Sequence, residues 1–253
     1  MRKKLWVPIA VVLALVVAAG AVWCFVFRDD APAEVSLERA TKSLDDATTA
    51  TTAAGPATGS AGSGSAADGL DGAWTVDPTI GSFSDFSSSF AGFRVQEQLA
   101  GVGAKTAVGR TPEVTGTMKL QGTTIPAASF EVDMTSLTTD DARRDGAIRT
   151  QSIETARFPK ATFTLTEPVE LASLPAEGEQ IAVDATGTLT LHGVTKSVTI
   201  PLEAQREGNV IAVVGQLEIP FSDFDIDKPS AAAVLSVDDK GVMEVQLFFT
   251  RTT

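Results

Sequence analysis

Alternating apolar and polar residues mark most of the C-terminal part of the chain. The clearest case is residues 186–203, TGTLTLHGVTKSVTIPLE, in which His192 and Gly193 separate two alternating runs. Period-two alternation rich in Val, Ile and Thr is typical of half-buried antiparallel strands. Glycine tolerates the positive φ angle that a tight turn requires. The pattern therefore predicts a β-hairpin that turns at His192 and Gly193.

Runs of the same kind recur along the chain, with turn residues between them. A single helix is expected at residues 140–156, because Thr138 or Thr139 can cap its start and Pro159 follows its end. Antiparallel strands with one apolar face must either close into a barrel or pair as a sandwich, and alternation alone leaves both open. The runs predict strands at residues 74–77, 83–98, 114–120, 128–134, 161–166, 181–191, 196–205, 210–220 and 242–250.

The N-terminal part carries a different pattern. Residues 5–27 contain no charged side chain, and as a helix they would extend about 35 Å, enough to cross a bilayer core of about 30 Å. The basic run RKK precedes this segment, so the positive-inside rule predicts a membrane anchor with the following chain on the extracytoplasmic side. A cleaved signal peptide is an alternative, because AGA at residues 19–21 fits a small-x-small site. Trp23 before Cys24 disfavours a lipoprotein signal.

The composition then changes twice before the alternating runs begin. Residues 28–46 are charged and could form a short helix, whereas residues 47–68 are nearly all Ala, Thr, Gly and Ser. The second composition cannot bury enough apolar surface to offset the entropy of ordering, so a disordered linker is expected. The predicted domain organisation is a cytoplasmic stub at 1–4, a transmembrane anchor or uncleaved signal at 5–27, a linker at 28–71 and a folded domain at 72–253.

Three segments of the predicted domain resemble the YceI-like family. LTLHGVTKSVTIPLE at residues 189–203 is similar to the signature hairpin of that family. Upstream, RDGAIR at residues 144–149 followed by RFP at 157–159 is similar to its RDxxLR and FP block, and IPFSDFDID at 219–227 resembles a third segment. Ser197 stands where proline is common in the family, and Asp225 stands where glycine is common.

The resemblance implies a fold, a ligand class and a location. The fold is mainly β, an eight-stranded antiparallel lipocalin-like barrel with one or two short helices. Its elongated apolar interior would bind an isoprenoid-type lipid, such as a polyprenyl lipid or a quinone. With the predicted anchor, the chain would be a single-pass protein of the bacterial cytoplasmic membrane, with its C-terminal domain on the extracytoplasmic side.

The apolar faces of the predicted strands supply the candidate ligand-binding residues. The alternative interpretation is an ordinary packed core, because most inward side chains of a small barrel only pack. A polar group of Arg144, Asp145 and Arg149 matches the family block and is a candidate for the mouth of the barrel, where it would contact a head group or a partner. Helix capping and surface ion pairing are the alternative for this group. The candidate lining residues are Phe130, Val132, Met134, Phe163, Leu165, Leu189, Leu191, Val245, Leu247 and Phe249.

Charge and composition exclude several function classes. The chain carries 20 Lys and Arg against 32 Asp and Glu, a net charge of −12, which disfavours a nucleic-acid partner. His192 is the single histidine and lies beside a predicted turn, and the single cysteine, Cys24, lies in the apolar segment. Neither a Ser-His-Asp triad nor a zinc site is therefore expected, and the sequence predicts neither an enzyme nor a cofactor.

Two functions remain after these exclusions. We expect an extracytoplasmic binding or carrier module for an isoprenoid lipid, which contacts the membrane through its N-terminal helix and whose protein partner is unidentified. The alternative is an extracytoplasmic stress-response or protein-interaction domain, whose barrel is filled by its own side chains and holds no lipid.

Overall fold

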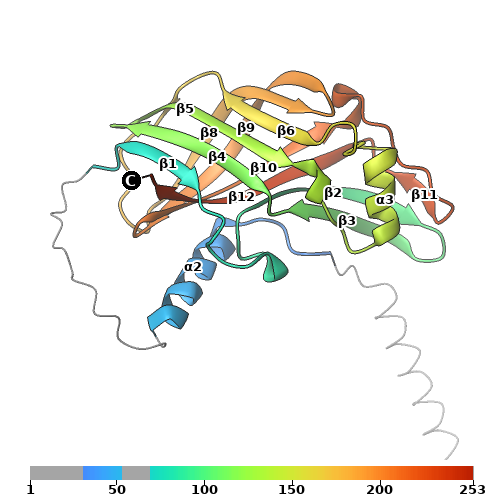
Figure 1. The fold of residues 1–253 in the computed structure, drawn as a ribbon, viewed down its shortest axis with the longest axis horizontal. Helices are drawn as coiled ribbons and strands as arrows, with labels where there is room; N and C mark the ends of the chain where they lie inside the picture. Colours follow the sequence, from blue (N-terminus) through green and yellow to red (C-terminus); the bar gives the residue numbers. More distant parts are fainter. Residues whose placement is uncertain (1–30, 53–68, 253) are drawn as a thin grey trace, which may run out of the picture.

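A β-barrel with helices on its outside forms the core of the molecule (Figure 1). The computed structural model describes residues 31–52 and 69–252. The helices are α2 (Leu37–Thr52) and α3 (Ala142–Thr150), with single turns of 3-10 helix at η1 (Phe83–Asp85), η2 (Met134–Ser136) and η3 (Phe221–Phe224). The strands are β1 (Gly72–Val76), β2 (Phe90–Leu99), β3 (Gly103–Thr111), β4 (Val114–Gln121), β5 (Thr124–Asp133), β6 (Lys160–Leu165), β7 (Val169–Glu170), β8 (Gln180–Leu191), β9 (Val194–Glu207), β10 (Val210–Pro220), β11 (Val234–Val237) and β12 (Lys240–Arg251).

Eight of the described strands form a closed wall. Their order is β1-β4-β5-β6-β8-β9-β10-β12, and β1 pairs with β12 to complete the ring. Every neighbouring pair in this ring is antiparallel. Strand β2 pairs with β12 and β11 along one edge and with β3 along the other. The predicted eight-stranded antiparallel barrel is thus confirmed, and the sandwich is excluded.

The hairpin predicted at residues 186–203 is the β8–β9 pair. Its register joins Leu191 to Val194, which leaves a two-residue turn. His192 and Gly193 both have positive φ angles, of 51° and 77°, as a type I′ turn requires. The predicted hairpin is therefore confirmed down to its turn residues.

Some elements differ from the prediction. Strands β3 and β11 were not expected, and β2 begins later than the run predicted at 83–98. Helix α3 is shorter than the predicted 140–156, and Asp141 caps it by accepting a hydrogen bond from the Arg143 backbone N–H at 2.8 Å. Asp141 rather than Thr138 or Thr139 takes this place.

Helix α2 overlaps the short helix expected within residues 28–46 and extends into the range expected as a linker. Leu37, Ala40 and Leu44 are buried against Ala212, Val214 and Phe248. The helix contacts β9 and β10 on the outside of the barrel (Figure 1). The apolar spacing of three and four residues supplies the one helical face that packs on the barrel.

A buried group of charges also fixes the chain just before α2. Glu244 is fully buried and accepts hydrogen bonds from Arg94 Nε at 2.9 Å and Arg110 Nε at 2.7 Å. The same two guanidinium groups donate to the carbonyl oxygens of Pro32 and Ala33, respectively. Paired and hydrogen-bonded charges of this kind are what a protein interior tolerates. Residues 32–44 are thus part of the folded body.

The predicted location in a membrane needs correction. None of the helices in residues 31–52 and 69–252 is long and apolar enough to cross a bilayer. A single-pass membrane protein is therefore not what the described structure shows. The anchor expected at 5–27 lies outside the described residues.

Candidate functional site: an apolar cavity inside the barrel

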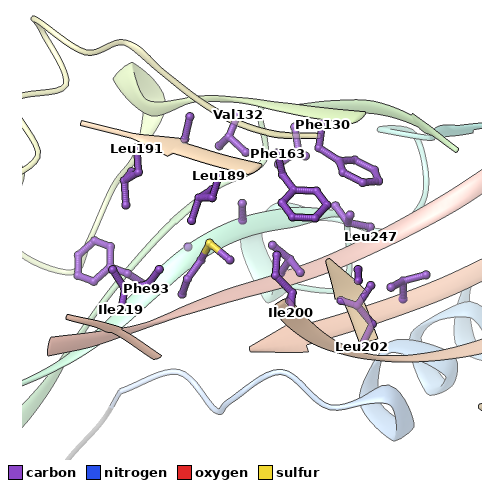
Figure 2. A pocket seen from close by; sticks show the side chains of 18 of the residues that line it. Phe93, Phe130, Val132, Phe163, Leu189, Leu191, Ile200, Leu202, Ile219 and Leu247 are labelled. Carbon is purple, nitrogen blue, oxygen red and sulfur yellow. The ribbon is translucent and has the colours of Figure 1, made fainter. Parts of the chain in front are cut away.

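A cavity of about 290 Å³ occupies the interior of the barrel. Its labelled side chains in Figure 2 are all hydrocarbon and come from β2, β5, β6, β8, β9, β10 and β12. The volume is at the lower end of the roughly 300–1,000 Å³ that is usual for ligand sites. It is about twice the volume of an engineered 150 Å³ apolar cavity that binds benzene. The interior is therefore large enough for part of an apolar chain.

All of the predicted lining residues lie at this cavity. Phe130, Phe163 and Phe249 form an aromatic group, with ring centroids 6.5 Å apart for the stacked pair Phe130 and Phe163 and 5.9 Å for the edge-on pair Phe130 and Phe249. Their role in binding a ligand stays a prediction. The cavity is lined by every one of Phe130, Val132, Met134, Phe163, Leu165, Leu189, Leu191, Val245, Leu247 and Phe249.

Several of these inward side chains are partly accessible to solvent, which is further evidence of a cavity. Phe130, Val132 and Val245 face the interior, yet each is only partly buried. In a barrel filled by its own side chains, inward residues at this depth would be fully buried. Their partial accessibility reflects open space inside the wall, and it disfavours the filled-barrel alternative.

Two glycines in the barrel wall leave space in which aromatic rings pack against the backbone. Gly116 is the cross-strand partner of Phe130, and a Cβ atom at Gly116 would overlap the Phe130 ring. A Cβ atom at Gly187 would likewise overlap the ring of Phe163. Glycine has no side chain of its own to occupy this space, so each ring covers the bare backbone instead of standing out into the lumen.

One end of the cavity is partly covered by packed side chains, and the partly buried Phe221 and Ile226 also belong to its wall. Met134, Leu137 and Ile148 are buried together there, with Ala161 in the same cluster. Ile148 belongs to α3, which lies at this end of the barrel (Figure 1). We call this the α3 end.

The polar group predicted at the mouth lies at the α3 end or outside the cavity. Arg144 lines the cavity and forms ion pairs with Glu97 and Asp140. Burial acts to lower the pKa of Arg144, but the two carboxylates outweigh it and the pKa is raised. Arg144 thus holds α3 against β2 as a fixed cation.

The other two members of that group have different surroundings. Asp145 Oδ1 accepts hydrogen bonds from the backbone N–H of Thr139 at 2.8 Å and from its hydroxyl at 2.7 Å. Arg149 is exposed on α3 and is not part of the cavity wall. Contact of these residues with a head group stays a prediction, which the geometry does not favour.

His192 is a structural residue of the hairpin turn. It lies in the turn, as expected, and its side chain is only 8% exposed. Nδ1 lies 2.9 Å from the carbonyl oxygen of Phe224 and Nε2 lies 3.0 Å from Glu154 Oε2. Both ring nitrogens are therefore engaged, and the imidazole joins the β8–β9 turn to two neighbouring loops.

The sequence pattern did not predict the opposite end of the cavity. Its wall there includes Leu171, Pro175, Ile181 and Arg206, all of them only partly buried. We call this the open end. Arg206 continues the alternation of inward residues on β9, but the predicted strand stopped at residue 205. A predicted strand that extended to residue 206 would have placed Arg206 among the inward-facing residues.

Comparison with protein families gives one match. A model of the YceI-like domain matches residues 74–249. That range covers the whole barrel wall except the ends of β1 and β12.

Curated relatives match over part of their length. UPF0312 protein VPA0850 of Vibrio parahaemolyticus is 34% identical over 114 residues, which are 42% of this chain and 57% of that protein. Protein YceI of Salmonella arizonae is 31% identical over 124 residues, which are 48% of this chain and 59% of that protein. The chain thus spans little more than half the length of these relatives.

Solved structures with a similar fold include two bacterial proteins. One is a polyisoprenoid binding domain from Saccharophagus degradans implicated in plant cell wall breakdown, with a TM-score of 0.53 and 23% identity over 71% of this chain and 98% of that one. The other is BcnA of Burkholderia cenocepacia, with a TM-score of 0.50 and 18% identity over 68% of this chain and 98% of that one. At these identities the likeness establishes the fold.

Proposed function

The chain belongs to the YceI-like family, and from this premise we propose that its barrel binds one isoprenoid-type lipid, such as a polyprenyl lipid or a quinone, in the apolar cavity. The observation that carries the proposal is the cavity itself, whose wall is hydrocarbon over most of its length. The fold is shared with a protein described as a polyisoprenoid binding domain, which supports the same ligand class.

The energetics of burial suit a chain of methyl-branched units. Burial of apolar carbon contributes about 0.8 kcal/mol per methylene, so one five-carbon unit contributes roughly 4 kcal/mol before the cost of ordering. Two or three units inside the cavity would therefore be enough for affinity in the micromolar range or better. The aromatic group of Phe130, Phe163 and Phe249 adds flat, polarisable surface against which such a chain packs.

The chemistry of the site is that of binding. Its wall offers few polar atoms, and His192 has both ring nitrogens engaged away from the cavity. Apolar burial without a reactive group holds a ligand and releases it unchanged. We therefore propose a binding or carrier role and no catalytic step.

Extraction of bound lipid tests the proposal. The full chain is purified without detergent, extracted with organic solvent and analysed by mass spectrometry, and the expected result is an isoprenoid species in stoichiometric amount. Chain that has been unfolded and refolded without lipid is the matched control, and it should bind an added three-unit isoprenoid hydrocarbon. Empty extracts, together with refolded chain that binds no isoprenoid, would contradict the proposal.

A further inference from the structure

Arg206 places a guanidinium group in the mostly apolar wall of the cavity, at the end away from Arg144 and α3. It lies near the end of β9, opposite Ile211 of β10, and Ile211 also lines the cavity. Two and four residues earlier on β9, Ala204 and Leu202 line the same cavity. Because side chains alternate along a strand, Arg206 belongs to this inward-facing set.

The guanidinium group is only partly satisfied. One nitrogen, Nη1, donates to the Gly208 carbonyl oxygen at 3.2 Å. The Nε–H is buried and has no hydrogen-bond partner, and Arg206 forms no ion pair with any residue that the structure describes. Leaving a buried donor unpaired is costly, and such groups in native proteins call for an explanation. An oxygen atom of a ligand would supply the missing acceptor.

The position of Arg206 is where the polar end of a lipid would lie. At the α3 end the cationic Arg144 is already paired with Glu97 and Asp140, whereas Arg206 at the opposite end has an unpaired Nε–H. An apolar chain that enters with its tail first therefore comes to rest with its head at the open end. There the head group meets the guanidinium.

Nearby carboxylates favour an uncharged head group. Glu207 is the next residue of β9, where its Oε1 accepts a hydrogen bond from Gln205. Glu177 Oε1 accepts a hydrogen bond from the Gly208 backbone N–H at 3.3 Å. The Glu177 carboxylate and the Arg206 guanidinium thus bond the same residue, Gly208, and a phosphate with a charge of about −1.5 to −2 at this end would be repelled by an acidic neighbour. A carbonyl oxygen accepts the same hydrogen bond without that repulsion.

We propose that Arg206 is a head-group subsite, in which its guanidinium donates a hydrogen bond to an uncharged, carbonyl-bearing head while the isoprenoid tail extends toward α3. The proposal rests on the proposed function, because it requires the tail to occupy the cavity. It makes Arg206 a specificity-determining residue for quinone-type heads over phosphorylated ones.

Binding titrations with matched ligands test the subsite. Three ligands share a three-unit isoprenoid chain and differ in the head: a benzoquinone, a monophosphate and no head at all. Isothermal titration of the full, delipidated chain should give the quinone the lowest Kd, about tenfold or more below the head-free hydrocarbon. Arg206→Met keeps an apolar stem without donors, and it should weaken quinone binding about 10- to 100-fold while hydrocarbon binding stays unchanged.

The control variant is Arg143→Met, whose side chain is 93% exposed on α3 and which should bind all three ligands as the unchanged chain does. The comparison of ligands on the unchanged chain keeps the test valid if Arg206→Met fails to fold. Equal affinity for quinone and hydrocarbon would overturn the subsite and leave the proposed function intact. Tighter binding of the monophosphate would overturn the assignment of an uncharged head. Binding of none of the three ligands would overturn the proposed function together with the subsite.

Discussion

Single glycines set the free space in this barrel. At Gly116 and Gly187 the wall is bare backbone, and the rings of Phe130 and Phe163 lie over it. An alanine at either position would place a methyl group where a ring now lies. Each ring would then have to turn away from the wall, and the direction left open to it is the lumen.

The substitution Gly116→Ala tests this arrangement. We expect it to lower the free energy of unfolding by about 1–3 kcal/mol, as overpacking usually does, and to weaken isoprenoid binding because the displaced ring fills the cavity. Thermal unfolding and ligand titration measure the two effects. Gly146→Ala in α3 is the control, since a Cβ atom there has nothing within 4 Å. Unchanged ligand binding in Gly116→Ala would show that the ring does not move into the lumen.

Helix α2 packs on the outside of the barrel and contributes to the stability of the fold. Its buried face packs on the outer side of β10 and β12, and the preceding residues are held by Arg94 and Arg110. The buried Glu244 keeps both guanidinium groups in place. The helix therefore covers apolar outer surface that a barrel of 74–249 alone would expose.

Leu37→Ala measures this contribution. Leu37 is 2% exposed, so its truncation should lower the free energy of unfolding by about 2–4 kcal/mol. Glu38→Ala on the exposed face of the same helix is the control and should stay within about 0.5 kcal/mol of the unchanged chain. Chemical denaturation at equal protein concentration gives both values. A Leu37→Ala chain as stable as the control would mean that α2 is not docked in solution.

At the scale of the whole molecule, the barrel was predictable and its contents were not. Period-two alternation decides which face of a strand turns inward, so residues such as Phe130, Leu189 and Leu247 were placed correctly. Strand β3 escaped because its sequence, GAKTAVGRT, has few large apolar side chains, and small residues such as Ala107 and Gly109 mark its face only weakly. Alternation predicts which side chains face the interior of the barrel, but not how much of the interior they fill. Hollow and filled barrels were therefore equally consistent with the pattern.

Contacts between distant residues were also beyond the reach of the pattern. Arg144 pairs with Glu97, which is 47 residues away in the chain, and His192 contacts the Phe224 carbonyl 32 residues away. Such pairs depend on how loops cross the ends of the barrel. Arg206 was missed for a local reason, since a strand only one residue longer would have included it.

The central claim is that the barrel has an apolar cavity that holds a lipid. The most direct test is to fill that cavity with a larger side chain. Ala185 on β8 is buried and lines the cavity, whereas Ala182 on the same strand is exposed. Lipid extracted from Ala185→Phe and Ala182→Phe chains is quantified by mass spectrometry, with thermal unfolding measured in parallel. We expect Ala185→Phe to stay folded and to lose its isoprenoid, while Ala182→Phe keeps it. Unfolding of Ala185→Phe would show a barrel already filled, and full lipid occupancy in that variant would show that the ligand is held elsewhere.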